Sequence, residues 1–453
     1  MTVPRTVLLS LLCTSGLFSE AQAQDPPDVI RSATLVEVTP DEPMTLVFPT
    51  FLHTWGFQRV GQAGAVLYSR GRTRFDDPQG VAVTVLDAWD DPGDEKDDDE
   101  ITVYGVNSGR AEIIYNTSMH AIAIYGRRGG GEGEFRDPHG IDADPSGNVV
   151  VADSGNDRVA VLFNDGRLLS HRRYLRAVAP GDSLSAPYDV SLVPGEGVWV
   201  SDSGNGRLVL FGLDGEVRRI MDLNGVMARP GAISISHRLQ RWSYFREHGL
   251  FVASRDGSLL VKLDQDGQEV ARIEAADLGQ DRMAVRYLAS DFYANVWATD
   301  GATHRIHKFD RQLSHLDSFG ARGGRDAQFD EPRGIGLWKR FGQMIVAERK
   351  GAQYYWIGAD ARALTARQRD GVLDLSYFLT EYAYVTVRVR FSGGGFAELY
   401  RRRFRRTGTQ EEALALPQER PLVWVEVVVE PTYSSYKYRE KVYRFRFAER
   451  ERR

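Results

Sequence analysis

Apolar and polar residues alternate along short segments between about residue 44 and residue 360, and turn residues separate these segments. The clearest example is the stretch 135–163, FRDPHGIDADPSGNVVVADSGNDRVAVLF, in which two Gly-Asn turns divide three alternating runs. Alternation with a period of two is typical of half-buried β-strands. The pattern therefore predicts short antiparallel strands joined by tight turns, and an all-β fold.

Looser copies of this stretch recur along the chain. Copies with the proline start at Pro78, Pro138, Pro187, Pro230 and Pro332, and a degenerate copy without it starts near Val285. A period of roughly 40 to 50 residues with about four strands per unit is the pattern of a β-propeller, not of a helical solenoid. The repeat predicts six units.

The units resemble NHL repeats. The residues of the best copy that fit the repeat's pattern are Phe135, Pro138, Gly140, Ile141, Gly147, Asn148, Asp153, Asn156 and Arg158. The resemblance implies a six-bladed propeller over residues 44–360. The N-terminal stretch LVFPTFLHTWGFQRVG resembles LDSFGARGG, which ends a unit, so we expect it to complete the last blade and remove an open sheet edge.

A different pattern follows residue 371. AYVTVRVRF, LVWVEVVVE and VYRFRF each place apolar residues on one face and polar residues on the other. Such strands are typical of an antiparallel sheet with one buried and one wet face. We expect a linker over 361–371 and a small β-sandwich over 372–453, whose opening resembles Ig-like or fibronectin-like modules.

The N-terminal residues have the pattern of a targeting signal. Arg5 precedes an apolar run, and Ala21-Gln22-Ala23 has the small-residue pattern of a signal peptidase site. We expect a signal peptide over 1–23, a linker over 24–43, and export to the periplasm or the cell exterior. Cleavage would remove Cys13, the one cysteine, which excludes disulfides and thiol catalysis in the mature chain. No later segment is long and apolar enough to span a membrane.

The formal net charge of −5 is unevenly distributed. From Ala366 onward the chain has 18 Lys and Arg against 12 Asp and Glu, a balance of +6, which leaves −11 for the rest. An acidic repeat region argues against nucleic-acid binding, which some intracellular NHL proteins perform.

The Asp-Ser-Gly-Asn-x-Arg motif occurs twice, which raises the question of a duplicated active site. A catalytic group is seldom needed in every unit, whereas a tight turn is, and Asp and Asn favour such turns. We interpret the motif as a structural turn with an Asp–Arg pair across the hairpin. The turn residues are Asp153, Asn156, Arg158, Asp202, Asn205, Arg207, Asp300 and Arg305, and Glu348 takes the aspartate's place in the last unit.

The residue between the proline and the glycine of each unit begins the innermost strand and is expected at the mouth of the central channel. This reasoning gives a ligand-binding set of Gln79, His139, Tyr188, Arg286 and Arg333. Arginine, histidine and tyrosine suit an anionic or carbohydrate-like ligand. The alternative is that these residues form a solvated rim without a ligand.

No complete catalytic set is present in the sequence. Lyases with NHL-type propellers supply zinc with channel histidines from several blades, whereas this chain has only His139 at that position. The sequence therefore favours a non-catalytic scaffold that binds a protein or a carbohydrate-like ligand and holds no cofactor. A metal-assisted lyase or hydrolase near His139 is the alternative.

Two insertions and one basic segment add further hypotheses. The acidic insertion 87–100 is either solvated or a calcium site, and the insertion 236–249 is either a partner surface or a short helix on the rim. The basic segment either protects an edge strand or contacts an anionic surface; its arginines are Arg401, Arg402, Arg403, Arg405 and Arg406.

Overall fold

We describe the fold from a computed structural model of the chain. The described residues are 45–47, 59–89, 101–118, 121–325, 327–369, 371–433 and 440–447. The predicted signal peptide and the linker 24–43 lie outside these residues, as does most of the acidic insertion 87–100. Within the described residues the chain is almost entirely β-structure, as the alternating pattern predicts.

Five antiparallel sheets of the repeat region have four strands each, in sequence order. The first two contain β3 (Pro78–Val85), β4 (Ile101–Asn107), β5 (Glu112–Ser118), β6 (Ala121–Tyr125), β9 (Pro138–Ala143), β10 (Asn148–Asp153), β11 (Arg158–Asn164) and β12 (Leu169–Leu175). The next three contain β15 (Val190–Val193), β16 (Gly197–Asp202), β17 (Arg207–Phe211), β18 (Val217–Asp222), β19 (Pro230–Ser236), β20 (Gly249–Ser254), β21 (Leu259–Leu263), β22 (Glu269–Glu274), β23 (Val285–Ser290), β24 (Val296–Asp300), β25 (Arg305–Phe309) and β26 (His315–Phe319).

A further sheet joins the two ends of the repeat region. Its strands are β27 (Ile335–Trp338), β28 (Gln343–Glu348), β29 (Gly351–Ile357), β1 (Leu46–Val47) and β2 (Arg59–Val60). Both N-terminal strands pair antiparallel with β29, Leu46 opposite Ile357 and Arg59 opposite Gln353. The expected pairing of the N-terminal stretch with the last unit is therefore confirmed for the described residues.

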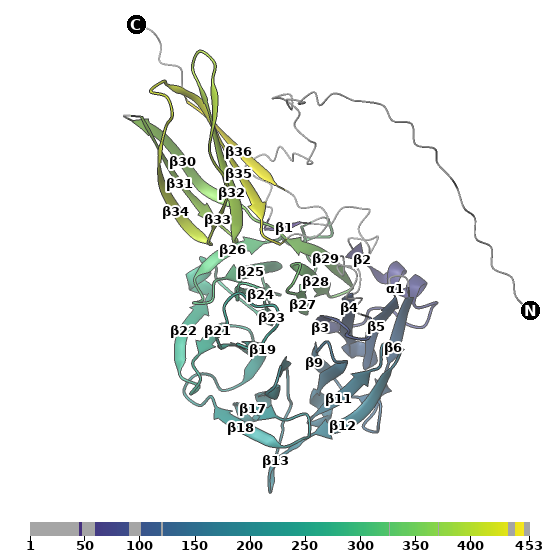
Figure 1. Cartoon of the computed structure of the whole chain (residues 1–453). Helices are drawn as coiled ribbons and strands as arrows, with labels where there is room; N and C mark the ends of the chain where they lie inside the picture. Colours follow the sequence, from purple (N-terminus) through teal and green to yellow (C-terminus); the bar gives the residue numbers. More distant parts are fainter. Residues whose placement is uncertain are drawn as a thin grey trace, which may run out of the picture. The chain divides into compact units, whose positions relative to one another are not determined.

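The first strand of each sheet lies innermost. β3, β9, β15, β19, β23 and β27 contact one another in sequence, and β27 returns to contact β3. Figure 1 shows the sheets arranged around this inner ring, with their fourth strands outside. This is the arrangement of a β-propeller.

The cores of the repeat region lie between neighbouring sheets. In β10, Val149 and Val151 pack with the first sheet, whereas Val150 and Ala152 pack with the third. Both faces of a middle strand are thus buried, which explains why VVVA is a continuous apolar run.

The glycine of the Pro-x-Gly motif is needed for close approach. A Cβ on Gly140 would lie 2.0 Å from Oδ1 of Asp189 in the next sheet, and a Cβ on Gly334 would lie 2.1 Å from the Gln79 carbonyl oxygen. The Gly140 N–H donates to the Tyr188 carbonyl at 2.9 Å. The motif therefore sets the contact between adjacent inner strands.

Two sheets follow the repeat region. They are β30 (Ala361–Arg369), β31 (Val372–Leu379) and β34 (Gly408–Ala415), and β33 (Phe396–Arg405), β32 (Ala383–Phe391), β35 (Leu422–Pro431) and β36 (Lys441–Arg446). The alternate valines of β32 and β35 share one buried cluster, as their spacing predicts. Residues 361–369, expected as a linker, instead form β30, whose residues pair along β31.

The smaller elements lie in the connections. They are α1 (Gln62–Tyr68), the paired strands β7 (Arg127–Arg128) and β8 (Glu134–Phe135), the paired strands β13 (Ala177–Ala179) and β14 (Asp182–Ser183), and the 3-10 turns η2 (Ser108–Arg110), η3 (Ser154–Asn156), η4 (Ser203–Asn205) and η5 (Ala275–Leu278). In the described part of the chain no helix has the length and hydropathy needed to cross a bilayer.

Candidate functional site

The repeated turn is a buried polar brace. Asp153 ends β10 with no solvent exposure, and its Oδ2 accepts from Arg158 Nε at 2.7 Å and Asn156 Nδ2 at 2.8 Å. Its Oδ1 accepts from the Arg136 N–H at 2.7 Å, just before β9. Burial raises the pKa of Asp153 despite these partners. The carboxylate thus ties the end of the second strand to the start of the first.

The third sheet repeats this brace. Asp202 Oδ2 accepts from Arg207 Nε at 2.7 Å and Asn205 Nδ2 at 2.9 Å, and Oδ1 accepts from the Ser185 N–H at 2.7 Å. Arg207 also pairs with Asp182. Every oxygen of the two aspartates is therefore occupied by a structural partner, which leaves none directed at a substrate.

In the fifth sheet the aspartate is Asp300, and its partner is a histidine in place of an arginine. Asp300 Oδ1 accepts from the Ala284 N–H at 2.9 Å, and Oδ2 contacts His307 Nε2 at 3.2 Å and Thr303 Oγ1 at 2.6 Å. Arg305 is exposed, and among the described residues it forms no ion pair with Asp300, contrary to the sequence expectation. Burial opposes ionisation, but these hydrogen bonds outweigh it and lower the pKa of Asp300 to about 2.

In the last sheet the N-terminal strand supplies the cation. Glu348 ends β28, and its Oε2 accepts from the Asp330 N–H at 2.7 Å. Its Oε1 accepts from Gln353 Nε2 at 2.7 Å and from Arg59 Nη2 of β2 at 3.3 Å. Arg59 also donates to the Gln328 carbonyl at 2.8 Å. The brace thus holds the N-terminal strand to the last sheet.

The structure brings three of the five predicted mouth residues into one network. The His139 and Tyr188 rings lie 4.9 Å apart between centroids, and Tyr188 stacks on Tyr287 at 5.7 Å. Tyr287 Oη donates to Gln79 Oε1 at 3.2 Å. The Arg255 guanidinium lies 3.7 Å from the Tyr188 ring centroid. His139 and Tyr188 are buried, at 8% and 4% exposure.

The side chains of the other two predicted residues lie outside that network. Arg286 is exposed, and its carbonyl accepts from Tyr188 Oη at 3.4 Å. Arg333 pairs with Asp77 and Glu331 and donates to the Pro78 carbonyl at 3.2 Å. Its guanidinium therefore joins the last unit to the first.

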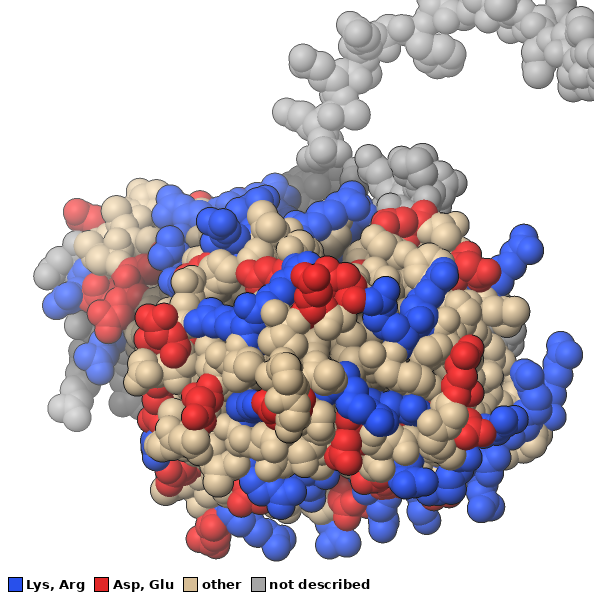
Figure 2. All heavy atoms as spheres, turned by 90° about the horizontal axis from the view of Figure 1, so that it is seen from below, with Lys and Arg blue, Asp and Glu red and all other residues tan. Residues whose placement is uncertain are grey.

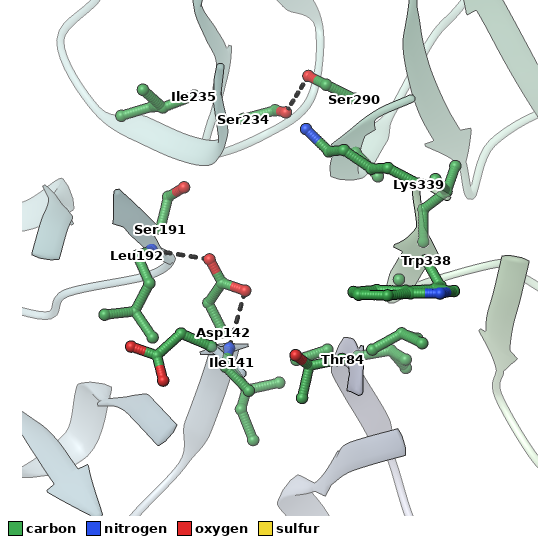
Figure 3. A pocket seen from close by; sticks show the side chains of 18 of the residues that line it. Thr84, Ile141, Asp142, Ser191, Leu192, Ser234, Ile235, Ser290, Trp338 and Lys339 are labelled. Carbon is green, nitrogen blue, oxygen red and sulfur yellow. Dashed lines mark hydrogen bonds between the residues drawn. The ribbon is translucent and has the colours of Figure 1, made fainter. Parts of the chain in front are cut away.

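A cavity of about 270 Å³ lies farther along the channel, toward the loops that follow the inner strands. All six inner strands line it, and none of the five predicted mouth residues does. Figure 3 shows Asp142 and Ser191 across from Lys339 and Trp338, with Ser234 and Ser290 beside them. Apolar walls with a few converging polar groups are typical of small-molecule pockets.

Two carboxyls bridge inner strands at this level. Asp142 accepts from the Ala143 N–H at 2.8 Å and from the Leu192 N–H of the next sheet at 2.7 Å. Asp189 accepts from Val190 and from Ile233 of the sheet after that, at 2.9 and 3.0 Å. Burial raises the pKa of Asp142 to about 6 and that of Asp189 to about 8. Both groups hold the ring together, and Asp142 also faces the cavity.

Lys339 supplies the cation on the opposite wall. Its Nζ donates to Gln240 Oε1 at 2.9 Å, and burial lowers its pKa to about 8. Ser234 and Ser290 share a 2.6 Å hydrogen bond nearby. At neutral pH the cavity thus offers an ionised carboxylate, an ammonium and several hydroxyls.

The insertion 236–249 forms turns and contains no helix. Its residues Gln240, Arg241 and Trp242 line the cavity, and Arg241 and Arg340 stack on Trp242 at 5.1 and 4.8 Å. The Tyr244 N–H donates to the Phe292 carbonyl at 2.8 Å. The insertion is therefore part of the cavity wall.

Four arginines of the basic segment lie on β33, an edge strand of its sheet, and Arg406 directly follows it. Arg402 pairs with Glu430, and Arg405 pairs with Glu412 at 2.7 Å. Arg401, Arg403 and Arg406 are exposed. Figure 2 shows acidic and basic side chains interspersed over the face that it presents.

The repeat has a match among known families. Residues 135–162 match the NHL repeat family model. A 49-residue segment, 11% of this chain, is 43% identical to Protein lin-41 of Caenorhabditis elegans. The chain spans only 4% of that protein's length.

The chain also resembles solved structures at low sequence identity. Virginiamycin B lyase from Staphylococcus aureus is 14% identical with a TM-score of 0.40, over 56% of this chain and 76% of the other. A gluconolactonase from Xanthomonas campestris is 12% identical with a TM-score of 0.45, over 71% and 99%. The lyase and gluconolactonase activities are those of the two solved proteins.

The repeat does not predict the cavity residues, because Asp142 and Lys339 have no counterpart at the same place in the other units. The available signal was local, because Asp142 interrupts an inner strand that is otherwise apolar after His139. Arg255 lies in the turn of a unit that lacks the Asp-Ser-Gly-Asn motif.

Proposed function

We propose that this protein is an exported, non-catalytic β-propeller that binds a small carbohydrate-like ligand in its channel cavity. The observation that carries the proposal is the cavity of about 270 Å³, in which Asp142 and Lys339 face each other among hydroxyl groups. The proposal keeps the binding function expected from the sequence and moves its site from the channel mouth to the cavity.

The chemistry of the cavity favours a neutral polyhydroxylated ligand. Sugar hydroxyls both donate and accept, so they pair with the Asp142 carboxylate and the Lys339 ammonium. Trp338 offers an apolar surface for the C–H groups of a sugar ring. The volume is near the lower end of ligand pockets, which favours a ligand of monosaccharide size.

Binding is tested on the full chain with a panel of hexoses and pentoses. We expect at least one sugar at about 10 mM to raise the melting temperature and to give a calorimetric binding isotherm. Lys339→Met should weaken that binding about tenfold to a hundredfold, because a charged hydrogen bond is lost. Lys350→Met, at an exposed lysine away from the cavity, is the matched control. No binding by any sugar, or equal binding by Lys339→Met, would refute the proposal.

An enzyme remains the second candidate because of one observation at His139. Its Nδ1 is buried, and no hydrogen-bond partner for it exists among the described residues, while Nε2 lies 3.4 Å from Asp137 Oδ2. A metal-assisted lyase or hydrolase would hold its ion there. Stoichiometric metal that is lost in His139→Ala would favour this candidate.

The proposal extends to the blades, the C-terminal sheets and the basic segment. We also propose that the six sheets of the described repeat region are the six blades of a propeller within residues 44–360, and that the two sheets described after it belong to an Ig-like or fibronectin-like module. The exposed arginines of the basic segment provide peripheral contact with an anionic surface. Retention of the chain on anionic vesicles at low salt, lost when Arg401, Arg403 and Arg406 become serine, would support that contact.

A further inference from the structure

Two loops of neighbouring sheets bring three metal-ligand side chains together. Glu196 lies in the turn between β15 and β16, and His237 and His248 lie at the two ends of the insertion between β19 and β20. His237 Nε2 is 2.7 Å from Glu196 Oε1, and the two imidazole rings are 4.4 Å apart between centroids. One ligand atom from each residue lies within 4.8 Å of the others.

The three residues differ in burial. His237 is buried at 3% exposure, the Glu196 side chain is 31% exposed, and His248 is exposed. The cluster thus has a fixed inner side and an open outer side. Two imidazoles and one carboxylate with an open position are a ligand set that zinc accepts in proteins.

We propose that Glu196, His237 and His248 form a zinc-binding site that clamps the insertion 236–249 to the neighbouring sheet. The ligands are Glu196 Oε1, His237 Nε2 and one nitrogen of His248, and water completes a tetrahedral set. This site is separate from His139 and from the cavity, so it does not depend on the proposed function.

Binding changes one hydrogen bond. In the structure His237 Nε2 faces the Glu196 carboxylate, and Nδ1 accepts from the Leu239 N–H at 3.2 Å. Zinc on Nε2 requires the ring proton on Nδ1, so the Leu239 N–H must turn away. Leu239 is 59% exposed, which leaves that segment room to move.

The site has a structural consequence for the cavity. Gln240, Arg241 and Trp242 line the cavity and follow His237 by three to five residues. A metal that joins both ends of the insertion to Glu196 would fix these wall residues. Zinc is therefore a structural ion here, and its role is to order the cavity wall.

The test uses the full chain purified without a histidine tag. Titration with zinc should give one site with micromolar or tighter affinity, and cobalt should give the visible absorption of a tetrahedral complex. His248→Ala removes an exposed ligand and should weaken zinc binding at least tenfold while the fold persists. Glu196→Gln keeps the shape and should weaken it similarly.

The controls separate this site from others. His315→Ala removes another exposed histidine, which contacts Ser318, and should leave zinc affinity unchanged. The proposal is overturned if the wild-type chain binds no stoichiometric zinc, if His248→Ala binds it equally well, or if His139→Ala abolishes it. The last outcome would instead support the channel enzyme. Sugar binding without zinc binding would leave the proposed function intact and overturn only this site.

Discussion

At the scale of single residues, the buried carboxylates have two different roles. Asp153 and Asp202 accept backbone N–H groups and a guanidinium, so their position is fixed from several sides. Asp142 is held by two backbone N–H groups and still faces a cavity. The same residue type therefore serves as a brace in one place and as a ligand contact in another.

Asp153→Ala should lower the free energy of unfolding by about 3 to 5 kcal/mol, because the buried Arg158 guanidinium would lose its ion-pair partner. Chemical denaturation of the two chains measures the difference. Arg349→Ala, which breaks the exposed pair with Asp330, should leave the midpoint unchanged. Sugar binding by Asp153→Ala should persist. Equal stability of Asp153→Ala and the wild-type chain would contradict the structural role.

The Asp–Arg pairing expected from the sequence is present in the two sheets that carry the full motif. Asp153 with Arg158 and Asp202 with Arg207 form the expected pairs, because the same turn geometry recurs. Asp300 could not be assigned in this way, because His307 reaches it from two residues beyond Arg305. The spacing of the motif does not predict which side chain of the next strand contacts the aspartate.

At the scale of the element, the inner strands depend on the glycine of Pro-x-Gly. Gly140 has ordinary backbone angles, so the requirement is space and not a positive φ. The strands themselves were predictable from alternation. The insertion 236–249 was not, because its polar residues carry no clear period. Strand β30 does alternate, with Leu364 and Ala366 half-buried between exposed residues, but this alternation is short and falls in the expected linker.

Gly140→Ala should destabilise the chain by about 3 kcal/mol or more, since the new Cβ would lie 2.0 Å from the Asp189 carboxylate and the inner strands would have to separate. Thermal denaturation gives the measurement. Gly61→Ala, where a Cβ meets nothing within 4 Å, is the matched control and should keep the melting temperature. A tolerated Gly140→Ala would mean that the inner strands do not pack as described.

At the scale of the whole molecule, buried ionisable groups of the channel predict how stability depends on pH. The pKa values of Asp142, about 6, and Asp189, about 8, lie above those of an unfolded chain. Because each carboxyl holds its proton to a higher pH in the folded state, the free energy of unfolding falls as pH rises from about 4 to the folded pKa. Burial lowers the pKa of Lys339 to about 8, so its charged form reduces the free energy of unfolding below pH 8. The free energy of unfolding rises again above pH 8, where Lys339 of the folded chain loses its proton.

We therefore expect the melting temperature to fall between pH 5 and pH 8 and to be lowest near pH 8. Scanning calorimetry across this range measures it. Asp189→Asn should flatten the slope between pH 6 and pH 8, whatever its effect on absolute stability. Asp165→Asn, in an exposed turn, should keep the wild-type slope. A melting temperature that rises steadily from pH 5 to pH 8 would contradict the assignment of these burial effects.

The pairing of β1 and β2 with β29 also determines when the ring can close during synthesis. The N-terminal strands are synthesised first, yet their sheet partners are residues 352–357. Arg59 likewise meets Glu348 only after nearly the whole repeat region has been made. The ring therefore cannot close while the chain is still growing through its repeats, and the unclosed intermediate exposes unpaired strand edges. Under the export proposed above, this delay would keep the chain unclosed while it crosses a membrane.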